Sequence, residues 1–413
     1  MRMKFNKSSQ LVLVSAASLL VASLLTACTQ FTQTLTVDFV FVASSKAAGP
    51  NNYGEIDVFE VNSESGRMRQ IPASPFPSAG RNPVAEAVSS DNASLFVVNQ
   101  DDNNIVQFVI GSDGKLYPFN TVNTPGIFPL GIAANAANLF VVDTYQPLPS
   151  CSPAAPCSGS IAVFPLTAAT KTQPVAIGTP AVNPSITAPY WPLILASNPK
   201  DVVVPTAVNV LASGNYVYVS AYDSSVTPHV GYIFGFSVDA GSVLSPLSGS
   251  PFAAGVLPSA ITSDKAGQFV YVPDYSRGNV LGFSVAAGAL TPLAGSPFPA
   301  GNSPSAIVVD PSFPFAYVTN STDSSVTAYS VSNGALTRLG AYATGLDPVA
   351  IGIDPSTNHF LYTANFLGNN LTGFQLSQTA GTLLYAQLSP FPSNDQPTAI
   401  AAVPHNGTGA GVH

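Results

Sequence analysis

One short apolar motif occurs seven times in this 413-residue chain, and it constrains the fold more than any other feature. Each copy has four residues rich in Val, Phe and Tyr, which is the length and composition of a buried β-strand. The copies are FVFV at 39–42, LFVV at 95–98, LFVV at 139–142, YVYV at 216–219, FVYV at 269–272, FAYV at 315–318 and FLYT at 360–363. The chain therefore builds one small unit repeatedly.

A second series of seven strands begins each time at a proline. The prolines are Pro83, Pro129, Pro205, Pro258, Pro304, Pro348 and Pro397, separated by 46, 76, 53, 46, 44 and 49 residues. Residues 256–301 hold one complete unit, in which turns separate four short strands. Four-stranded units that repeat every 40–50 residues are the blades of β-propellers.

The two series are offset, and the offset predicts how the ring closes. No proline strand precedes 39–42, and no apolar strand follows 397–403. Pairing these two segments completes the first blade and removes two open sheet edges. We therefore predict an all-β, seven-bladed β-propeller of four-stranded antiparallel blades over residues 37–404. The C-terminal strand closes it by pairing with the N-terminal blade, and residues 405–413 form a tail.

The N-terminus has the pattern of a targeting segment. Arg2, Lys4 and Lys7 precede an apolar run at 11–24, and Leu25-Thr-Ala-Cys28 follows. This ending resembles a bacterial lipoprotein signal, which implies removal of residues 1–27, a lipid on Cys28 and a short tether at 28–36. An uncleaved apolar anchor is the alternative interpretation. We expect an exported protein, lipid-anchored in the bacterial cell envelope, and Thr29 after the cysteine favours the outer membrane.

The other two cysteines, Cys151 and Cys157, lie six residues apart. An oxidising compartment favours a disulfide between them. A metal site is the alternative, but two thiolates with no nearby His are too few ligands. We expect no metal and no cofactor, because the chain has no zinc, phosphate-loop or dinucleotide motif.

Composition limits the partners. The net charge is −8, and no basic stripe offsets it, so we expect no nucleic acid partner. Only 8% of the residues are charged, against roughly 25% in an average soluble domain. The polar surface must therefore consist largely of Ser, Thr, Asn and Gln. We expect a monomer.

The order of strands sorts the loops between two faces. We letter the strands of each blade A to D, starting from the proline strand. The B–C turns and D–A loops share one face, here called the B–C face, and the A–B and C–D turns share the other. The candidate binding residues on the B–C face are Arg81, Asn99, Asp101, Asp102, Asp143, Tyr145, Tyr222, Asp223, Tyr275, Asn320 and Asn365. The recurring Asp and Asn either cap their own turns or form a ring of oxygens that binds a sugar or a cation.

Acid–base chemistry on this face has few candidates, namely His229, Asp274 and Arg277. A lone His in a Thr-Pro-His loop also suits an ordinary surface residue. Two insertions, at 144–160 and 169–200, interrupt the third unit, and the second contains the only Trp. Long loops on a regular scaffold are common functional sites, but a linker or packing flap is the interpretation that we favour for these two.

Several repeated motifs together resemble the lactonase-type seven-bladed propellers. These are the YVYV-like strands, the YVTN sequence at 317–320, the Gly-x-Leu turns, and the Ser-Pro-Phe motifs at 74–76, 250–252, 296–298 and 389–391. The resemblance covers residues 37–403. The family includes 6-phosphogluconolactonases, cyclisation enzymes and exported proteins with binding roles.

The resemblance does not transfer a catalytic residue to any position here. A phosphorylated lactone needs Arg or Lys around the phosphate, and the B–C face offers little beyond Arg81 and Arg277. We therefore expect a binding module for a glycan, peptide or partner protein. The alternative is a hydrolase of an unphosphorylated lactone, in which Asp274 or His229 activates water and Arg277 polarises the carbonyl group.

Overall fold

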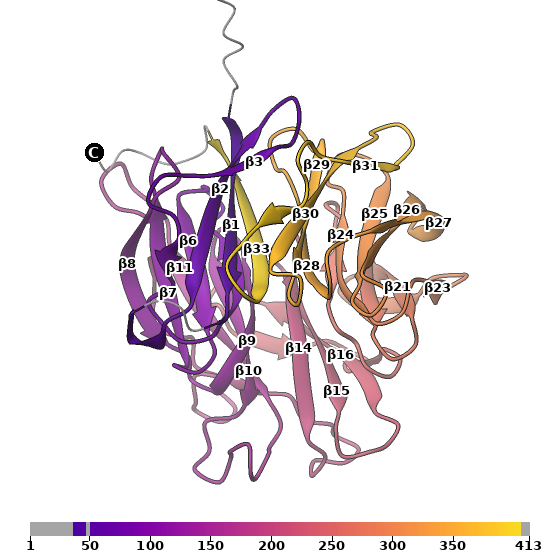
Figure 1. Cartoon of the computed structure of the whole chain (residues 1–413). Helices are drawn as coiled ribbons and strands as arrows, with labels where there is room; N and C mark the ends of the chain where they lie inside the picture. Colours follow the sequence, from indigo (N-terminus) through magenta and orange to yellow (C-terminus); the bar gives the residue numbers. More distant parts are fainter. Residues whose placement is uncertain (1–35, 47–49, 406–413) are drawn as a thin grey trace, which may run out of the picture. The chain divides into compact units, whose positions relative to one another are not determined.

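The computed structural model describes residues 36–46 and 50–405. These residues form β-strands and a short 3-10 helix, η1 (Pro50–Asn52). The strands build seven small antiparallel sheets arranged in a ring (Figure 1), which confirms the predicted seven-bladed propeller. The predicted signal peptide, Cys28 with its lipid, and nearly all of the tether and tail lie outside the described residues. No helix in the described part is long and apolar enough to cross a membrane.

Each blade is a meander in which strand A is innermost. Its outermost strand, D, is divided into two segments in blades 1, 3, 4, 5 and 7. Blade 1 consists of β33 (Pro397–Pro404), β1 (Thr36–Ser44), β2 (Glu55–Asn62), β3 (Met68–Gln70) and β4 (Phe76–Pro77). Blade 2 consists of β5 (Pro83–Val88), β6 (Ser94–Asn99), β7 (Asn104–Ile110) and β8 (Leu116–Asn123). Blade 3 consists of β9 (Ile127–Ala134), β10 (Asn138–Tyr145), β11 (Ser160–Thr167), β12 (Ala176–Ile177) and β13 (Trp191–Pro192).

The remaining four blades follow the same order. Their strands are β14 (Val203–Val210), β15 (Tyr216–Asp223), β16 (Val230–Val238), β17 (Leu244–Pro246) and β18 (Phe252–Ala253); β19 (Thr262–Ser263), β20 (Phe269–Asp274), β21 (Asn279–Ala286), β22 (Ala289–Pro292) and β23 (Phe298–Pro299); β24 (Pro304–Val309), β25 (Phe315–Asn320), β26 (Ser325–Ser332) and β27 (Ala335–Ala343); β28 (Pro348–Ile353), β29 (Phe360–Asn365), β30 (Asn370–Leu376), β31 (Leu383–Tyr385) and β32 (Phe391–Pro392).

The C-terminal strand closes the ring as the offset predicts. Strand β33 pairs antiparallel with β1, so that Ile400 lies opposite Val42 and Val403 opposite Phe39. In Figure 1 the yellow β33 runs beside the indigo β1. The last strand is thus strand A of the first blade, and it pairs with the inner edge of β1.

The repeated apolar motif is strand B, and it forms the core between blades. Its residues are buried on both sides because each blade packs between two others. Phe41 of blade 1, for example, belongs to one cluster with Val97 and Phe108 of blade 2. The repeat therefore specifies the interfaces between blades as well as the strands themselves.

An aromatic residue at the start of strand B fixes the spacing of neighbouring blades. Its ring packs on the glycine of the next blade's C–D turn, and all five of these glycines have positive φ. The pairs are Phe39–Gly114, Tyr216–Gly288, Phe269–Gly334, Phe315–Gly381 and Phe360–Gly66. A Cβ on any of these glycines would lie 2.3–2.6 Å from the ring, so only Gly fits both the turn and the contact.

Candidate functional site

The recurring Asp and Asn on the B–C face occupy one equivalent position in five blades. Each is the strand B residue that pairs with the first proline of strand A. None exposes more than 1% of its surface. These residues are Asn99, Asp143, Asp274, Asn320 and Asn365. They therefore do not present their oxygens to solvent as a ring around the channel.

These buried side chains instead hold the D–A loops. A loop glycine lies directly over each one, and a Cβ on it would approach the side chain to 2.2–2.7 Å. The pairs are Gly80–Asn99, Gly126–Asp143, Gly255–Asp274, Gly301–Asn320 and Gly345–Asn365. Asp143, Asp274 and Asn320 each accept a backbone N–H group of the D–A loop that leads in from the preceding blade. Asp274 also caps the N–H of Ser276 in its own turn.

Asp274 illustrates why this position does not supply a catalytic base. Its carboxylate accepts the backbone N–H groups of Val256 at 2.8 Å, Leu257 at 3.1 Å and Ser276 at 3.2 Å. A general base must reach the proton that it removes. A buried carboxylate that is already bonded to three N–H groups does not meet this requirement.

Asp143 and Asp223 differ from the other carboxylates. Asp143 accepts one N–H group, from Gly126 at 3.2 Å, and its Oδ1 has no partner. Burial raises the pKa of Asp143 to about 7. Asp223 lies two residues past the equivalent position, Ala221, and its Oδ1 caps the N–H of Ser225 at 2.8 Å.

Where strand A begins on the B–C face, six blades each have a hydrogen-bonded pair of residues next to this innermost strand. One member directly precedes the proline of strand A, and its carbonyl oxygen accepts a hydrogen bond from the residue that follows the strand B partner of that proline. We call these twelve residues the mouth ring. The pairs, with donor–acceptor distances, are Gln396–Ser45 (3.0 Å), Asn82–Gln100 (2.9 Å), Phe128–Thr144 (2.7 Å), Leu257–Tyr275 (2.8 Å), Ser303–Ser321 (2.9 Å) and Asp347–Phe366 (2.8 Å).

Five of the residues before the prolines have left-handed backbones. Their φ values are 55–61°, at Asn82, Phe128, Ser303, Asp347 and Gln396. This conformation is costly for residues other than Gly, and bulky Phe128 is the least expected among them. The N–H of Phe128 donates to Asn103 Oδ1 at 2.7 Å and its carbonyl accepts from Thr144, which stabilises the conformation.

The side chains of the mouth ring are mostly amides, hydroxyls and aromatic rings. Asn82 Nδ2 donates to Gln100 Oε1 at 3.1 Å and to Asp101 Oδ1 at 3.2 Å. The Ser321 hydroxyl donates to Asp347. Beside the ring, Tyr145 meets Phe128 edge-on, with 6.2 Å between ring centroids. Such a surface offers paired donors and acceptors next to apolar faces.

On the B–C face, Arg81 and Lys46 are each paired with a carboxylate, whereas Arg277 is not paired with one in the part of the chain that the structure describes. Arg81 Nε donates to Asp102 Oδ1 at 2.7 Å, and Lys46 pairs with Asp395. Sequence reasoning overlooked Lys46, which lies in the long B–C loop of blade 1. Arg277 lines an outer hollow together with Arg338 of β27. The mouth ring itself, all of it within the described chain, has no basic side chain.

The three catalytic candidates are not brought together. The His229 ring lies 5.0 Å from the Tyr222 ring, centroid to centroid, and its Nδ1 is 2.9 Å from the Val226 carbonyl oxygen. Within the described residues, no hydrogen bond or ion pair joins His229 to Asp274 or Arg277. Nor do three or more His, Cys, Asp or Glu side chains in that part of the chain gather as metal ligands.

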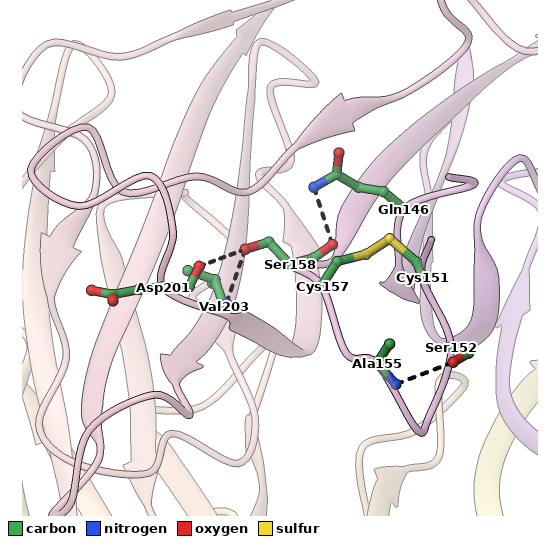
Figure 2. The surroundings of a disulfide bond; sticks show 8 residues. All are labelled: Gln146, Cys151, Ser152, Ala155, Cys157, Ser158, Asp201 and Val203. Atoms are coloured by element: carbon green, nitrogen blue, oxygen red, sulfur yellow. Dashed lines mark hydrogen bonds between the residues drawn. A yellow bond between two sulfur atoms is a disulfide. The ribbon is translucent and has the colours of Figure 1, made fainter. Parts of the chain in front are cut away.

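The two insertions of blade 3 are tied to each other, because the N–H of Leu193 in the second donates to the carbonyl of Gly159 in the first at 2.9 Å. Cys151 and Cys157 form a disulfide in the first (Figure 2). Beside it, Ser158 Oγ donates to the carbonyl of Asp201 at 2.9 Å and accepts the N–H of Val203 at 3.1 Å. In the second insertion, Trp191 and Leu193 are buried in the core between blades 3 and 4. This burial supports the packing-flap interpretation of the second insertion.

Comparison with known proteins shows that part of the chain is similar to one protein family. Residues 289–400 match the family model described as lactonase, 7-bladed beta-propeller. No curated protein matches the chain in sequence.

Solved structures resemble almost the whole chain. A candidate 6-phosphogluconolactonase from Bacteroides fragilis is 21% identical, with a TM-score of 0.67, over 90% of this chain and 99% of that one. The periplasmic gluconolactonase of Pseudomonas aeruginosa is 19% identical, with a TM-score of 0.66, over 89% and 99% of the two chains. At these identities the likeness establishes the fold.

Proposed function

We propose that this protein is an exported β-propeller whose mouth ring binds an uncharged, hydroxyl-rich ring, either a sugar or an unphosphorylated sugar lactone. The observation that carries the proposal is the chemistry of the mouth ring. It has amides, hydroxyls, one carboxylate and aromatic faces, and no basic side chain. A glycan or a small lactone is therefore preferred over a peptide as ligand.

Two features of the ring support a sugar-like ligand. Hydroxyl groups both donate and accept, so they suit the amides of Asn82 and Gln100 and the hydroxyl of Ser321. Phe128 and Tyr145 add apolar faces on which the C–H side of a sugar ring can pack. A phosphate group would require a free Arg or Lys, and Arg81 and Lys46 are already paired with carboxylates.

Hydrolysis of such a lactone is the second candidate function. The match of residues 289–400 to the lactonase model favours it, and so does the likeness to a periplasmic gluconolactonase. Asp347 lies in the matched segment, is partly exposed, and accepts a hydrogen bond from Ser321. We assign it the role of a general base that activates water, in place of the buried Asp274.

We place the protein in the cell envelope, anchored by a lipid on Cys28. The N-terminal pattern supports this location, and the disulfide of Cys151 and Cys157 agrees with an oxidising compartment. Cys28→Ser should move the protein from the membrane fraction to the soluble fraction. Retention of this variant in the membrane fraction would reject the lipid anchor.

The test compares the full chain with Asp347→Asn and with Glu64→Gln, a control that removes an exposed carboxylate from the opposite face. Gluconolactone, 6-phosphogluconolactone and glucose are the probes. Turnover of gluconolactone that is lost in Asp347→Asn alone supports the hydrolase. Binding without turnover, weakened only in Asp347→Asn, supports the binding module. Preference for the phosphorylated lactone would contradict both candidates.

A further inference from the structure

A hollow of about 310 Å³ opens between blades 5 and 6, and none of its lining residues belongs to the mouth ring. Arg277 reaches it from the B–C turn of blade 5, and Arg338 reaches it from β27, the outermost strand of blade 6. Asp323 and Asn302 complete its polar lining. The two arginines are 61 residues apart in sequence, so only the packing of adjacent blades brings them to one hollow.

Neither guanidinium has an ion-pair partner within the described chain, whereas Lys46, Arg69, Arg81 and Lys115 each pair with a carboxylate. The carboxylate in the hollow, Asp323, offsets only one of the two positive charges. Asp323 accepts the backbone N–H of Asn302 at 2.7 Å and its Nδ2 at 2.8 Å. Because two guanidinium groups face one carboxylate, the net positive charge of the hollow favours a bound anion.

The backbone of the hollow indicates which anion fits. Phosphate sites usually offer free N–H groups, but those that line this hollow are already used. Gly278 donates to Asp274, Ala300 to Gly278, Gly301 to Asn320, and Asn302 to Asp323. Asp323 also repels a dianion. A carboxylate has a single charge and a planar shape that matches two guanidinium groups.

We propose that this hollow binds the carboxylate of a sugar acid, a uronate or an aldonate. Arg277 and Arg338 hold the carboxylate group. Asn302 Nδ2 is directed to Asp323, which leaves Oδ1 free to accept from a sugar hydroxyl. The site uses the guanidinium groups and not the mouth ring, so it stands apart from the proposed function.

Calorimetric titration of the full chain tests the site with glucuronate, gluconate, glucose and glucose 6-phosphate as probes. The variants are Arg277→Gln and Arg338→Gln, with Arg67→Gln as a control on the opposite face. All three arginines are exposed, so the variants should fold. We expect glucuronate or gluconate to bind more tightly than glucose, and each hollow variant to weaken this binding about tenfold, the effect of losing one charged hydrogen-bonding partner.

Three outcomes overturn the proposal. Equal affinity for glucuronate and glucose removes the role of the carboxylate. Tighter binding of glucose 6-phosphate assigns the hollow to phosphate. If Arg67→Gln weakens binding as much as Arg277→Gln does, the ligand is attracted by the general surface charge and not by this hollow. The relative affinities of glucuronate and gluconate decide which sugar acid is preferred. Failure of the mouth-ring variant Asp347→Asn leaves these results unaffected, so the two proposals fail separately.

Discussion

The hydroxyl of Tyr362 donates to the carbonyl oxygen of Gly66 at 3.1 Å, across 296 residues of chain. Tyr362 belongs to strand B of blade 7 and Gly66 to the C–D turn of blade 1. Tyr218, Tyr271 and Tyr317 make the same bond to Gly288, Gly334 and Gly381 of the next blade. The interface at which the ring closes therefore uses the same contact as the interfaces within the continuous chain.

Tyr362→Phe should destabilise the fold by about 1–2 kcal/mol, because it leaves a buried carbonyl oxygen without its donor. Urea unfolding followed by tryptophan fluorescence measures the change. Tyr385→Phe is the matched control. Tyr385 also donates to a carbonyl, that of Ala343 at 3.0 Å, but it is 59% exposed and water can replace the bond. Equal losses of stability in the two variants would show that the Tyr362–Gly66 hydrogen bond contributes no more than an exposed one.

Removal of residues 394–413 should open the ring. It deletes β33, whose Val403 and Ile400 pack in the cores on either side of blade 1. Loss of these two side chains alone costs about 3–6 kcal/mol, and the inner edge of β1 loses its partner. Thermal unfolding of the truncated and full chains measures the loss. An unchanged melting temperature would mean that β33 does not close the propeller.

Asp143→Asn should stabilise the protein above neutral pH. Burial raises the pKa of Asp143 from 3.8 to about 7, so the folded state binds this proton more tightly than the unfolded state does. The wild-type chain consequently loses stability as the pH rises from about 4 to about 7, at up to about 1.4 kcal/mol per pH unit. Asn does not ionise, and it already occupies this position in three other blades as Asn99, Asn320 and Asn365.

Urea unfolding at pH 5 and pH 8 tests this prediction. The advantage of Asp143→Asn should be larger at pH 8. Asp274→Asn serves as the control and should destabilise at both pH values. An amide nitrogen cannot accept the N–H bonds that the Asp274 oxygens now accept. An advantage of Asp143→Asn that does not change with pH would mean that ionisation of the buried carboxyl group is not its cause.

The fold was predictable because its determinants repeat in sequence. The repeated apolar strands predict the blades, and the prolines mark the register between strands A and B. Pro83, Pro304 and Pro348 each lie opposite the Asn that ends strand B. The closure followed from the offset between the two series. Each end of the repeat has one unpaired strand, and the two unpaired strands can pair only with each other.

The site was less predictable because its members share a backbone position and not a residue type. The mouth-ring residues before six of the prolines are Asn, Phe, Leu, Ser, Asp and Gln, and their common feature is a carbonyl oxygen that accepts a hydrogen bond. The burial of the Asp and Asn residues did leave a signal, a glycine three residues before the proline, as in Gly80 and Pro83. Arg277 and Arg338 meet only through blade packing, which no local pattern records.

Glu86 breaks the repeat at the centre of the ring. It is the third residue after the proline of strand A, where the other blades have Ile132, Val208, Ile261, Ile307, Ile351 and Ile400. Both of its carboxyl oxygens are buried without a hydrogen-bond partner. The adjacent strands β33, β6 and β9 have no ionisable side chain, and β1 has only Asp38, at the end that pairs with Pro404. Burial alone therefore raises the pKa of Glu86 well above its usual value.

Glu86→Ile should stabilise the protein, and increasingly so at higher pH. Because the folded state holds the Glu86 proton more tightly than the unfolded state, wild-type stability falls as the pH rises above about 4.5, by up to about 1.4 kcal/mol per unit. Ile removes this loss and restores the apolar residue of the other six blades. Glu86→Gln is the comparison. It also removes the pH dependence, but it stays less stable than Glu86→Ile because a buried amide lacks partners. Unfolding in urea at pH 5, 7 and 9 measures all three chains. If Glu86→Ile were less stable than wild type at pH 9, the carboxylate would have a partner or a role that burial does not explain.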